Sequence, residues 1–386
     1  MKPRTLAVHA GTQGPGPGAP SEASPPIHLA SAPLFDRLED LEAAYEDDAF
    51  FYRRYGTANQ AELEQAIFAL EGGGDGHRAL VLGTGMAALT LAILALNPPG
   101  RRVVGAAGLY GGSLALLSTE LPRLGIGGAV VDVDDPGALD RALDGAGVLL
   151  VETISNPAMR VADIPALAER AHAAGAVLLV DNTFASPVIC RPLELGADAV
   201  MESATKYLCG HADAMAGTLV MAEAATRRAR ELARVHGSTA APLDCWLVLR
   251  GIRTLALRVE AASASAARVA EVLRDHPAVE SVNYPGLGPD PIAARVLSNG
   301  YGGMLSFTLR GGEAAVSRAC ARMRMISLMP SLADVATSVS HPASTSHRGM
   351  DELGMAAAGT GVGMLRLSVG VEDVDDILGD LLQALD

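Results

Sequence analysis

From residue 61 onward the chain repeats one pattern, in which a short apolar run is followed by turn residues and a helical segment. Strands this apolar, separated by helices, are typical of a mostly parallel sheet that helices cover on both faces. In such sheets, ligands bind beyond the carboxyl ends of the strands. The sequence therefore predicts an α/β fold, with strands at residues 79–82, 102–105, 128–133, 148–152, 176–181, 199–202 and 218–221 and helices at 61–70, 86–96 and 164–174.

The 386 residues leave room for two or three domains, and the pattern divides them unequally. Residues 1–60 contain a Pro and Gly cluster and then polar and aromatic residues, which indicates an extended arm with little core of its own. The repeating pattern predicts the main α/β domain at 61–262. A smaller C-terminal α/β domain is expected at 263–386, with a helix at 263–274, strands at 303–309 and 364–369, and a closing helix at 374–385.

Charge and cysteine content exclude several functions. Lys and Arg total 30 against 44 for Asp and Glu, and a net charge of -14 disfavours binding to nucleic acid or to acidic membranes. No apolar run approaches the roughly 20 residues of a membrane helix, and the first 18 residues lack the layout of a secretory signal. The four cysteines form no C-x-x-C pair, so neither a metal site nor a disulfide framework is expected. A cytoplasmic location is predicted.

Polar side chains follow three neighbouring strands at the points where each strand ends. Glu152 and Asn156 follow the first strand, Asp181 the second, and Ser203 to Lys206 the third. Burying such groups together is costly unless a ligand pairs with them. A partly desolvated lysine is a suitable nucleophile, and the chain has only one other lysine, Lys2. An ordinary ion pair between Asp181 and Lys206 would occupy the same positions, so the strand ends alone leave both interpretations open.

A glycine-containing turn, Gly83-Thr84-Gly85-Met86, lies between a predicted strand and a helix. Backbone N–H groups at a helix start bind phosphate, so the turn predicts a phosphate site. The same turn could begin a dinucleotide fingerprint. That fingerprint needs an acidic residue about 20 positions later, and residues 106–108 are Ala, Ala and Gly, which counts against it.

Ordered motifs over essentially the whole chain resemble one enzyme family. The segment Ser203-Ala204-Thr205-Lys206-Tyr207, followed by Gly210-His211-Ala212-Asp213, is similar to the lysine signature of the Cys/Met-metabolism pyridoxal-phosphate enzymes. The other matching motifs are Val8-His9-Ala10-Gly11, Pro25-Pro26-Ile27, Tyr52-Arg53-Arg54, Gly85-Met86, Leu109-Tyr110-Gly111, Asp181-Asn182-Thr183, Tyr284-Pro285-Gly286-Leu287, Ser331-Leu332, His341-Pro342-Ala343-Ser344 and Leu365-Arg366-Leu367-Ser368-Val369-Gly370.

The resemblance implies a pyridoxal-phosphate transferase fold of type I and a role for each matched residue near the cofactor ring. Lys206 would hold pyridoxal 5'-phosphate as a Schiff base and shuttle protons. Asp181 would pair with the protonated pyridine nitrogen. Tyr110 would stack on the ring and protonate the leaving group, and Asn156 would contact the phenolic side. Without the family, Tyr110 would be interpreted as core packing beside a glycine turn.

The resemblance also implies how the phosphate and the amino-acid substrate are bound. The phosphate would lie on the Gly85 and Met86 amides and the Ser203 and Thr205 hydroxyls. The arm's Tyr52 and Arg54 would reach the phosphate of a neighbouring subunit, which implies a homotetramer, a dimer of dimers with shared active sites. Arg366, together with Ser331 and Tyr110, would bind the substrate, with Arg366 clamping its carboxylate. Without the family resemblance, Arg366 would be interpreted as a solvent-exposed residue of a strand.

Departures from the family's motifs bear on the substrate. Thr57-Ala58-Asn59 replaces the Asn-Pro-Thr that follows the arm's arginine, and Gly112 stands where methionine gamma-lyases usually have cysteine. Pro330 stands where cystathionine-handling gamma enzymes usually have glutamate and beta-lyases usually have tyrosine. Together, Pro330 and the apolar Met329 favour a pocket for a small uncharged side chain.

The predicted function is therefore that of a carbon-sulfur lyase. It would release a thiol, ammonia and 2-oxobutyrate from methionine, homocysteine or cystathionine by gamma-elimination. Gamma-replacement on an O-acyl-homoserine, as in cystathionine gamma-synthase or O-acetylhomoserine sulfhydrylase, shares the early steps and stays open. A non-catalytic relative that binds pyridoxal phosphate and a sugar aminotransferase are further alternatives. The intact set of Lys206, Asp181, Tyr110 and Arg366 counts against the non-catalytic relative, and an aminotransferase acting on sugars would not need Arg366.

Overall fold

The computed structural model describes residues 1–11, 22–46, 50–348, 354–355 and 358–386. Its larger sheet has seven strands in the order β1-β7-β6-β5-β4-β2-β3. β7 runs antiparallel to both of its neighbours, and the other pairs are parallel. The predicted, mostly parallel sheet is confirmed. The strands are β1 (His77–Leu82), β2 (Arg102–Ala106), β3 (Gly128–Val131), β4 (Ala146–Glu152), β5 (Val177–Asp181), β6 (Ala199–Ser203) and β7 (Gly217–Ala222).

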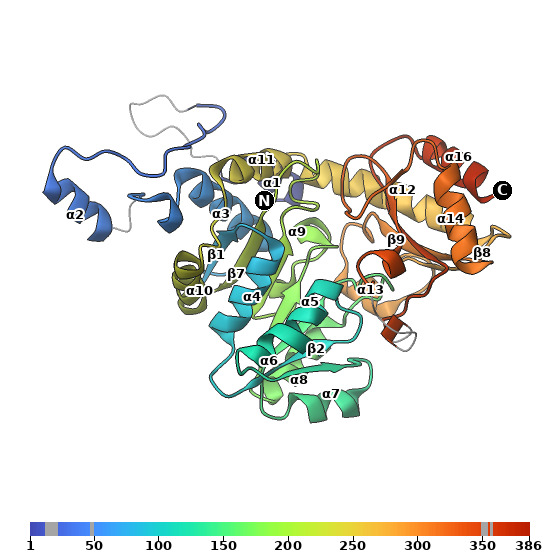
Figure 1. The fold of residues 1–386 in the computed structure, drawn as a ribbon, viewed down its shortest axis with the longest axis horizontal. Helices are drawn as coiled ribbons and strands as arrows, with labels where there is room; N and C mark the ends of the chain where they lie inside the picture. Colours follow the sequence, from blue (N-terminus) through green and yellow to red (C-terminus); the bar gives the residue numbers. More distant parts are fainter. Residues whose placement is uncertain (12–21, 47–49, 349–353, 356–357) are drawn as a thin grey trace.

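Helices cover both faces of this sheet. Successive strand residues point to opposite faces, and the residues on each face are apolar. In β4, Leu149 and Val151 belong to one buried cluster, whereas Val148 and Leu150 belong to another. Figure 1 shows the helices around the sheet. They are α3 (Ala58–Glu71), α4 (Gly85–Leu96), α5 (Gly111–Ala115), the π-helical turn η2 (Leu116–Glu120), α6 (Leu121–Arg123), α7 (Pro136–Leu143), α8 (Ile164–Ala173), α9 (Ser186–Ile189), the 3-10 turn η3 (Pro192–Leu195), α10 (Glu223–His236) and α11 (Pro242–Ile252).

A second, smaller sheet lies on the right of Figure 1, with strand order β10-β11-β12-β9-β8. Its strands are β8 (Val279–Asn283), β9 (Met304–Leu309), β10 (Ser327–Leu328), β11 (Ser338–Ser340) and β12 (Met364–Ser368). Phe307, Leu365 and Leu367 are fully buried in its own apolar cluster. The associated helices are α12 (Leu255–Arg274), α13 (Pro291–Val296), α14 (Gly312–Arg322), the 3-10 turn η4 (Pro342–Ser344) and α16 (Val374–Leu385).

Several predicted bounds need correction, and the largest concerns α12. The helix expected from residue 263 begins at Leu255, two turns earlier. Its apolar stripe is interrupted in the sequence by Arg258, which is buried and donates hydrogen bonds to the carbonyls of Tyr207 and Gly251. A charged residue with such partners is compatible with the buried face of a helix, but the sequence does not reveal the partners. The strand expected to reach residue 133 ends at Val131.

The N-terminal segment has two helices, of which the first packs against other helices and the second is exposed. α1 (Pro3–His9) contacts α3 and α12. α2 (Leu38–Glu46) has no buried residue and projects away from the larger sheet in Figure 1. The apolar side chains of Leu34, Leu38 and Tyr45 are exposed, and a 3-10 turn, η1 (Arg53–Tyr55), follows. Within the described ranges, no helix combines the length and apolar character needed to cross a membrane.

Candidate active site

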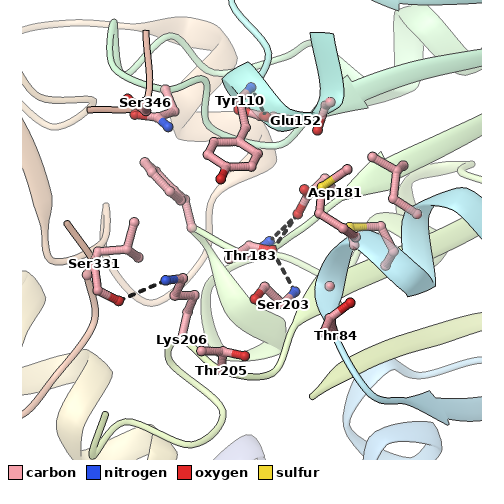
Figure 2. Close-up of a pocket in the computed structure, with 18 of the residues that line it drawn as sticks. Thr84, Tyr110, Glu152, Asp181, Thr183, Ser203, Thr205, Lys206, Ser331 and Ser346 are labelled. Atoms are coloured by element: carbon pink, nitrogen blue, oxygen red, sulfur yellow. Dashed lines mark hydrogen bonds between the residues drawn. The ribbon is translucent and has the colours of Figure 1, made fainter. Parts of the chain in front are cut away.

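A cavity of about 540 Å³ lies at the carboxyl ends of β4, β5 and β6, beside the smaller sheet (Figure 2). Ten of the twelve site residues predicted from the sequence line it: Gly85, Met86, Tyr110, Asn156, Asp181, Ser203, Thr205, Lys206, Ser331 and Arg366. The strand register explains much of this convergence. Glu152 of β4 is paired with Asp181 of β5, and Asp181 is paired with Met201 of β6. Carboxyl ends of parallel strands meet at one edge of the sheet, so these side chains are neighbours.

Lys206 lies in the turn after β6, and its Nζ donates a hydrogen bond to the Ser331 hydroxyl at 2.8 Å. Burial lowers the pKa of Lys206, and the nearby positive charge of Arg366 lowers it further. Both effects favour the neutral amine that a nucleophile needs. Among the residues described, Lys206 forms no ion pair with Asp181, so the ordinary ion-pair interpretation is wrong.

Asp181 is the last residue of β5, and its carboxylate accepts hydrogen bonds from Thr183. Its Oδ1 accepts the backbone N–H of Thr183 at 3.0 Å and the Thr183 hydroxyl at 2.5 Å. The Thr183 hydroxyl in turn accepts the Ser203 N–H at 2.9 Å, as Figure 2 shows. Burial raises the pKa of Asp181, whereas the two bonds from Thr183 lower it. The other carboxylate oxygen accepts no such bond from the described residues, and Asp181 lines the cavity.

The start of α4 forms one end of the cavity. The Thr84 hydroxyl caps the helix by accepting the Ala87 N–H at 2.9 Å. A Cβ on Gly85 would lie 2.8 Å from the Ser203 Cβ, so only glycine permits this close approach. The Ser203 and Thr205 side chains line the same end. Free N–H groups at a helix start, two hydroxyls and a glycine cradle fit a phosphate group.

Arg366 of β12 lines the cavity from the smaller sheet and is 5% exposed. It donates to Asn156 Oδ1 at 3.0 Å and to the Ser331 carbonyl at 3.2 Å, while its Nε is buried without a partner among the described residues. Burial lowers the pKa of Arg366 to about 10. The solvated-strand interpretation is therefore wrong. A buried guanidinium that lacks a carboxylate partner in the described chain fits an anionic ligand.

Tyr110 stands at the mouth of the cavity with its side chain 44% exposed, so it is not core packing. Its backbone N–H donates to Glu152 Oε1 at 2.6 Å. A Cβ on the next residue, Gly111, would lie 2.0 Å from the carbonyl oxygen of Ser346. The turn at Tyr110 is therefore packed directly against the loop that carries Ser346, and Figure 2 shows both residues on the same side of the cavity.

Some lining residues were not among the predicted site residues. Glu152 and Thr183 belong to the polar strand ends and could have been chosen by that signal, and Thr84 could have been recognised as a helix cap. Ser346 belongs to a loop of the smaller unit, and nothing in its local sequence indicates the cavity. Pro330 lines the cavity as expected, whereas Met329 does not.

Tyr52 and Arg54 do not line the cavity of their own chain. Arg54 donates to the Arg234 carbonyl at 2.9 Å, and its guanidinium lies over the Tyr52 and Tyr55 rings at 5.4 and 5.1 Å. Tyr52 is 43% exposed. The two arm residues thus lie together, apart from the other ten.

Known proteins resemble this chain over its full length. A cystathionine gamma-synthase from Mycobacterium bovis is 38% identical, over 99% of this chain and 96% of that protein. An L-methionine gamma-lyase from Porphyromonas gingivalis is 37% identical, over 94% of this chain and 92% of that protein. A Campylobacter jejuni structure, described as an O-acetylhomoserine (thiol)-lyase with N'-pyridoxyl-lysine-5'-monophosphate, is 28% identical, with a TM-score of 0.92 and complete coverage of both chains.

These similarities agree with a cavity that has a partly buried lysine, a helix start that fits a phosphate group, and a buried arginine that fits an anionic ligand. The family described as Cys/Met metabolism PLP-dependent enzyme matches residues 4–386. The fold is that of the type I pyridoxal-phosphate enzymes, as predicted, and pyridoxal phosphate is the cofactor. The chain belongs to the Cys/Met-metabolism family of pyridoxal-phosphate-dependent enzymes.

Proposed function

We propose that this enzyme breaks the bond between the gamma carbon and sulfur of a sulfur amino acid by gamma-elimination, releasing a thiol, ammonia and 2-oxobutyrate. One observation carries the proposal: Ser331 contacts Lys206 and Arg366 at once. Its hydroxyl accepts from the Lys206 amine, and its carbonyl accepts from the Arg366 guanidinium. An amino acid whose carboxylate binds Arg366 therefore has its alpha carbon close to the lysine that must move a proton.

Each residue has a distinct task in this proposal. When bound, pyridoxal phosphate draws electrons from the amino-acid carbon next to the carboxylate. Lys206 Nζ takes the alpha proton, and its burial keeps a neutral amine available for that step. The Tyr110 hydroxyl gives a proton to the departing sulfur. Gly85, Met86, Ser203 and Thr205 would hold the phosphate, Asp181 the pyridine nitrogen, and Asn156 the phenolic side while it orients Arg366.

The wall near Ser331 is apolar and supports an uncharged substrate side chain. The two chain neighbours of Ser331, Pro330 and Leu332, line the cavity. So do the apolar side chains of Phe184 and Met215. Because Pro330 supplies neither a carboxylate nor a hydroxyl, a distal ammonium group such as that of cystathionine would find no charged partner at this position. A thioether or thiol side chain would bury apolar surface instead. Methionine or homocysteine is therefore preferred over cystathionine.

Gamma-replacement on an O-acyl-homoserine is the second candidate. The resemblance to a cystathionine gamma-synthase over 99% of the chain supports it. Replacement and elimination share the binding of the amino acid and the removal of its alpha proton, which the residues above would perform in either reaction. They differ in whether a thiol or water meets the activated substrate.

Product analysis of the purified enzyme tests these two candidates. With L-methionine, L-homocysteine or L-cystathionine supplied separately, we expect 2-oxobutyrate and ammonia in equal amounts, together with methanethiol, hydrogen sulfide or cysteine, respectively. No keto acid from any of the three would refute the elimination proposal. Formation of a thioether amino acid from O-acetyl- or O-succinyl-homoserine plus a thiol, in place of keto acid, would establish replacement.

We further propose that residues 1–60 are an arm that completes the site of a neighbouring subunit, with 61–262 as the cofactor domain and 263–386 as the C-terminal domain. The positions of Tyr52 and Arg54 outside their own cavity support this division. The exposed apolar side chains of Leu34 and Leu38 support a partner surface at the arm. The assembly would be a homotetramer, a dimer of dimers. The four unpaired cysteines of each chain suit the reducing cytoplasm.

A further inference from the structure

Glu152 is a buried carboxyl group in the cavity to which the proposed function assigns no task. Its side chain is 9% exposed, and Oε1 accepts the Tyr110 N–H at 2.6 Å. Oε2 is buried and has no hydrogen-bond partner among the residues described. Leaving a charged oxygen buried without a donor is unfavourable. The group therefore needs either a partner or a proton.

The nearest acidic neighbour of Glu152 is Asp181, its register partner on β5. Two carboxylates side by side in a buried site do not both ionise readily, because their charges repel in a low dielectric. The facing positive charge is Arg366 of β12, and its hydrogen bonds go to Asn156 and Ser331. Within the described ranges, neither carboxyl forms an ion pair. One proton shared between the two groups is the arrangement that relieves the repulsion.

The hydrogen bonds decide which of the two carboxyls holds the proton. Asp181 Oδ1 accepts two bonds from Thr183, one from its backbone N–H and one from its hydroxyl, and the same hydroxyl accepts the Ser203 N–H. Donors directed at one carboxylate stabilise its ionised form. Glu152 accepts the Tyr110 N–H on Oε1 and is also stabilised by the backbone N–H of Asn156, and a proton on Oε2 leaves the Tyr110 bond intact. The hydrogen bonds therefore favour Asp181 as the ionised carboxylate and Glu152 as the protonated carboxylic acid.

We infer that Glu152 is a positioning residue that carries the proton of the Glu152–Asp181 pair on Oε2, and so leaves Asp181 as the anion available to the cofactor's pyridine nitrogen. Through Oε1 the same residue holds the Tyr110 turn beside the ring site. Electrostatics support this assignment, since burial and then the neighbouring Asp181 raise the pKa of Glu152 well above its usual range, against the opposing effects of the Tyr110 and Asn156 N–H groups and of Arg366. The inference rests on pyridoxal phosphate as cofactor and does not depend on which sulfur amino acid is used.

Cofactor binding to two matched variants tests the inference without any sulfur amino acid. Glu152→Gln keeps the shape, the neutral charge and the acceptor for Tyr110, so its dissociation constant for pyridoxal phosphate at neutral pH should stay within about fivefold of the native value. Asp181→Asn removes the proposed anion and should weaken binding beyond that limit. If Glu152→Gln weakens binding by more than this amount, Glu152 acts as a charge and the inference is wrong.

Infrared difference spectra of the cofactor-free protein supply a readout that a merely structural residue would not change. Native protein minus Glu152→Gln should show the carbonyl stretch of a protonated carboxylic acid at neutral pH, and a carboxylate band there instead would overturn the inference. A second measurement covers the case in which Glu152→Gln does not fold. In Asp181→Asn, where the repelling charge is gone, this acid band should disappear at a lower pH than in the native protein; an unchanged titration would equally contradict the inference.

Discussion

Lys206 and Ser331 are joined by a hydrogen bond of 2.8 Å between the lysine Nζ and the serine hydroxyl, across 125 positions of the sequence. Lys206 follows β6 of the larger sheet, whereas Ser331 follows β10 of the smaller one. The Ser331 carbonyl accepts from Arg366 of β12. The bond therefore sets the distance between the proton-carrying amine and the carboxylate-binding guanidinium, and it does so at the contact between the two sheets.

Replacing Arg366 with lysine should weaken substrate binding without releasing the cofactor. Lysine keeps the charge but cannot give the two parallel N–H bonds of a guanidinium, and it loses the bond to Asn156. We expect KM for the amino acid to rise by about 10- to 100-fold, which corresponds to the roughly 1.5–3 kcal/mol of a charged hydrogen bond. Steady-state kinetics measure this, with the exposed Arg310→Lys as a control. An unchanged KM would show that Arg366 does not bind the substrate.

A methyl group at Gly111 should disrupt the contact between the Tyr110 turn and the loop of the smaller unit. The added Cβ would meet the Ser346 carbonyl at 2.0 Å, and backbone atoms cannot move aside cheaply. Gly111→Ala should lose about 1–3 kcal/mol of unfolding free energy and most of its kcat/KM. Gly379→Ala, in α16 with no atom near the new methyl, is the matched control and should be neutral or slightly stabilising. Equal stability of the two variants in urea denaturation would contradict the predicted contact.

Mixed oligomers test whether the arm completes a neighbouring site. Arg54→Ala and Lys206→Ala should each be inactive alone, since one lacks the proposed phosphate contact and the other the reactive amine. After co-refolding, hybrid sites with neither substitution should recover up to about a quarter of native activity, as random pairing predicts. Arg37→Ala, which removes another exposed arm arginine, should keep activity without mixing. No recovery in oligomers shown to be mixed would mean that the sites are not shared.

Glu202→Gln should make the stability of the protein less dependent on pH. Glu202 and Glu71 are buried together, and burial raises the pKa of both, that of Glu202 well above its usual range. A carboxyl with a raised folded-state pKa contributes stability that is complete below the unfolded value near 4.5 and is lost as pH rises through the folded-state pKa. The native protein should therefore weaken as the pH rises above about 4.5, by about 1.4 kcal/mol for each unit by which the folded-state pKa exceeds the unfolded one.

The Gln variant stays neutral at all of these pH values, so its urea midpoint should fall less over the same range. Glu169→Gln, an exposed change on α8, should follow the native curve. Parallel curves for all three proteins would show that Glu202 ionises in the folded state as freely as in the unfolded one.

Local patterns were sufficient for the elements with simple periodicity. The closing helix was predicted at 374–385, where the structure has Val374–Leu385, and all seven strands of the larger sheet were found within two residues of their ends. The start of α12 was missed because Arg258 is buried only through carbonyls supplied by distant segments. The polar site residues at the strand ends could be predicted because they directly follow the apolar runs that predict the strands. Ser346 was not predicted, because its place in the cavity depends on a contact with Gly111.

The sequence by itself determined the strand and helix pattern, the polar strand ends and the motifs of the family, because these properties depend on residue order along a short stretch of chain. Only the tertiary structure decided that Lys206 bonds to Ser331 and not to Asp181, that Arg366 is buried without a described counterion, and that Glu152 faces Asp181. Charge states and partners of buried groups depend on register and on the approach of remote segments, which residue order does not specify.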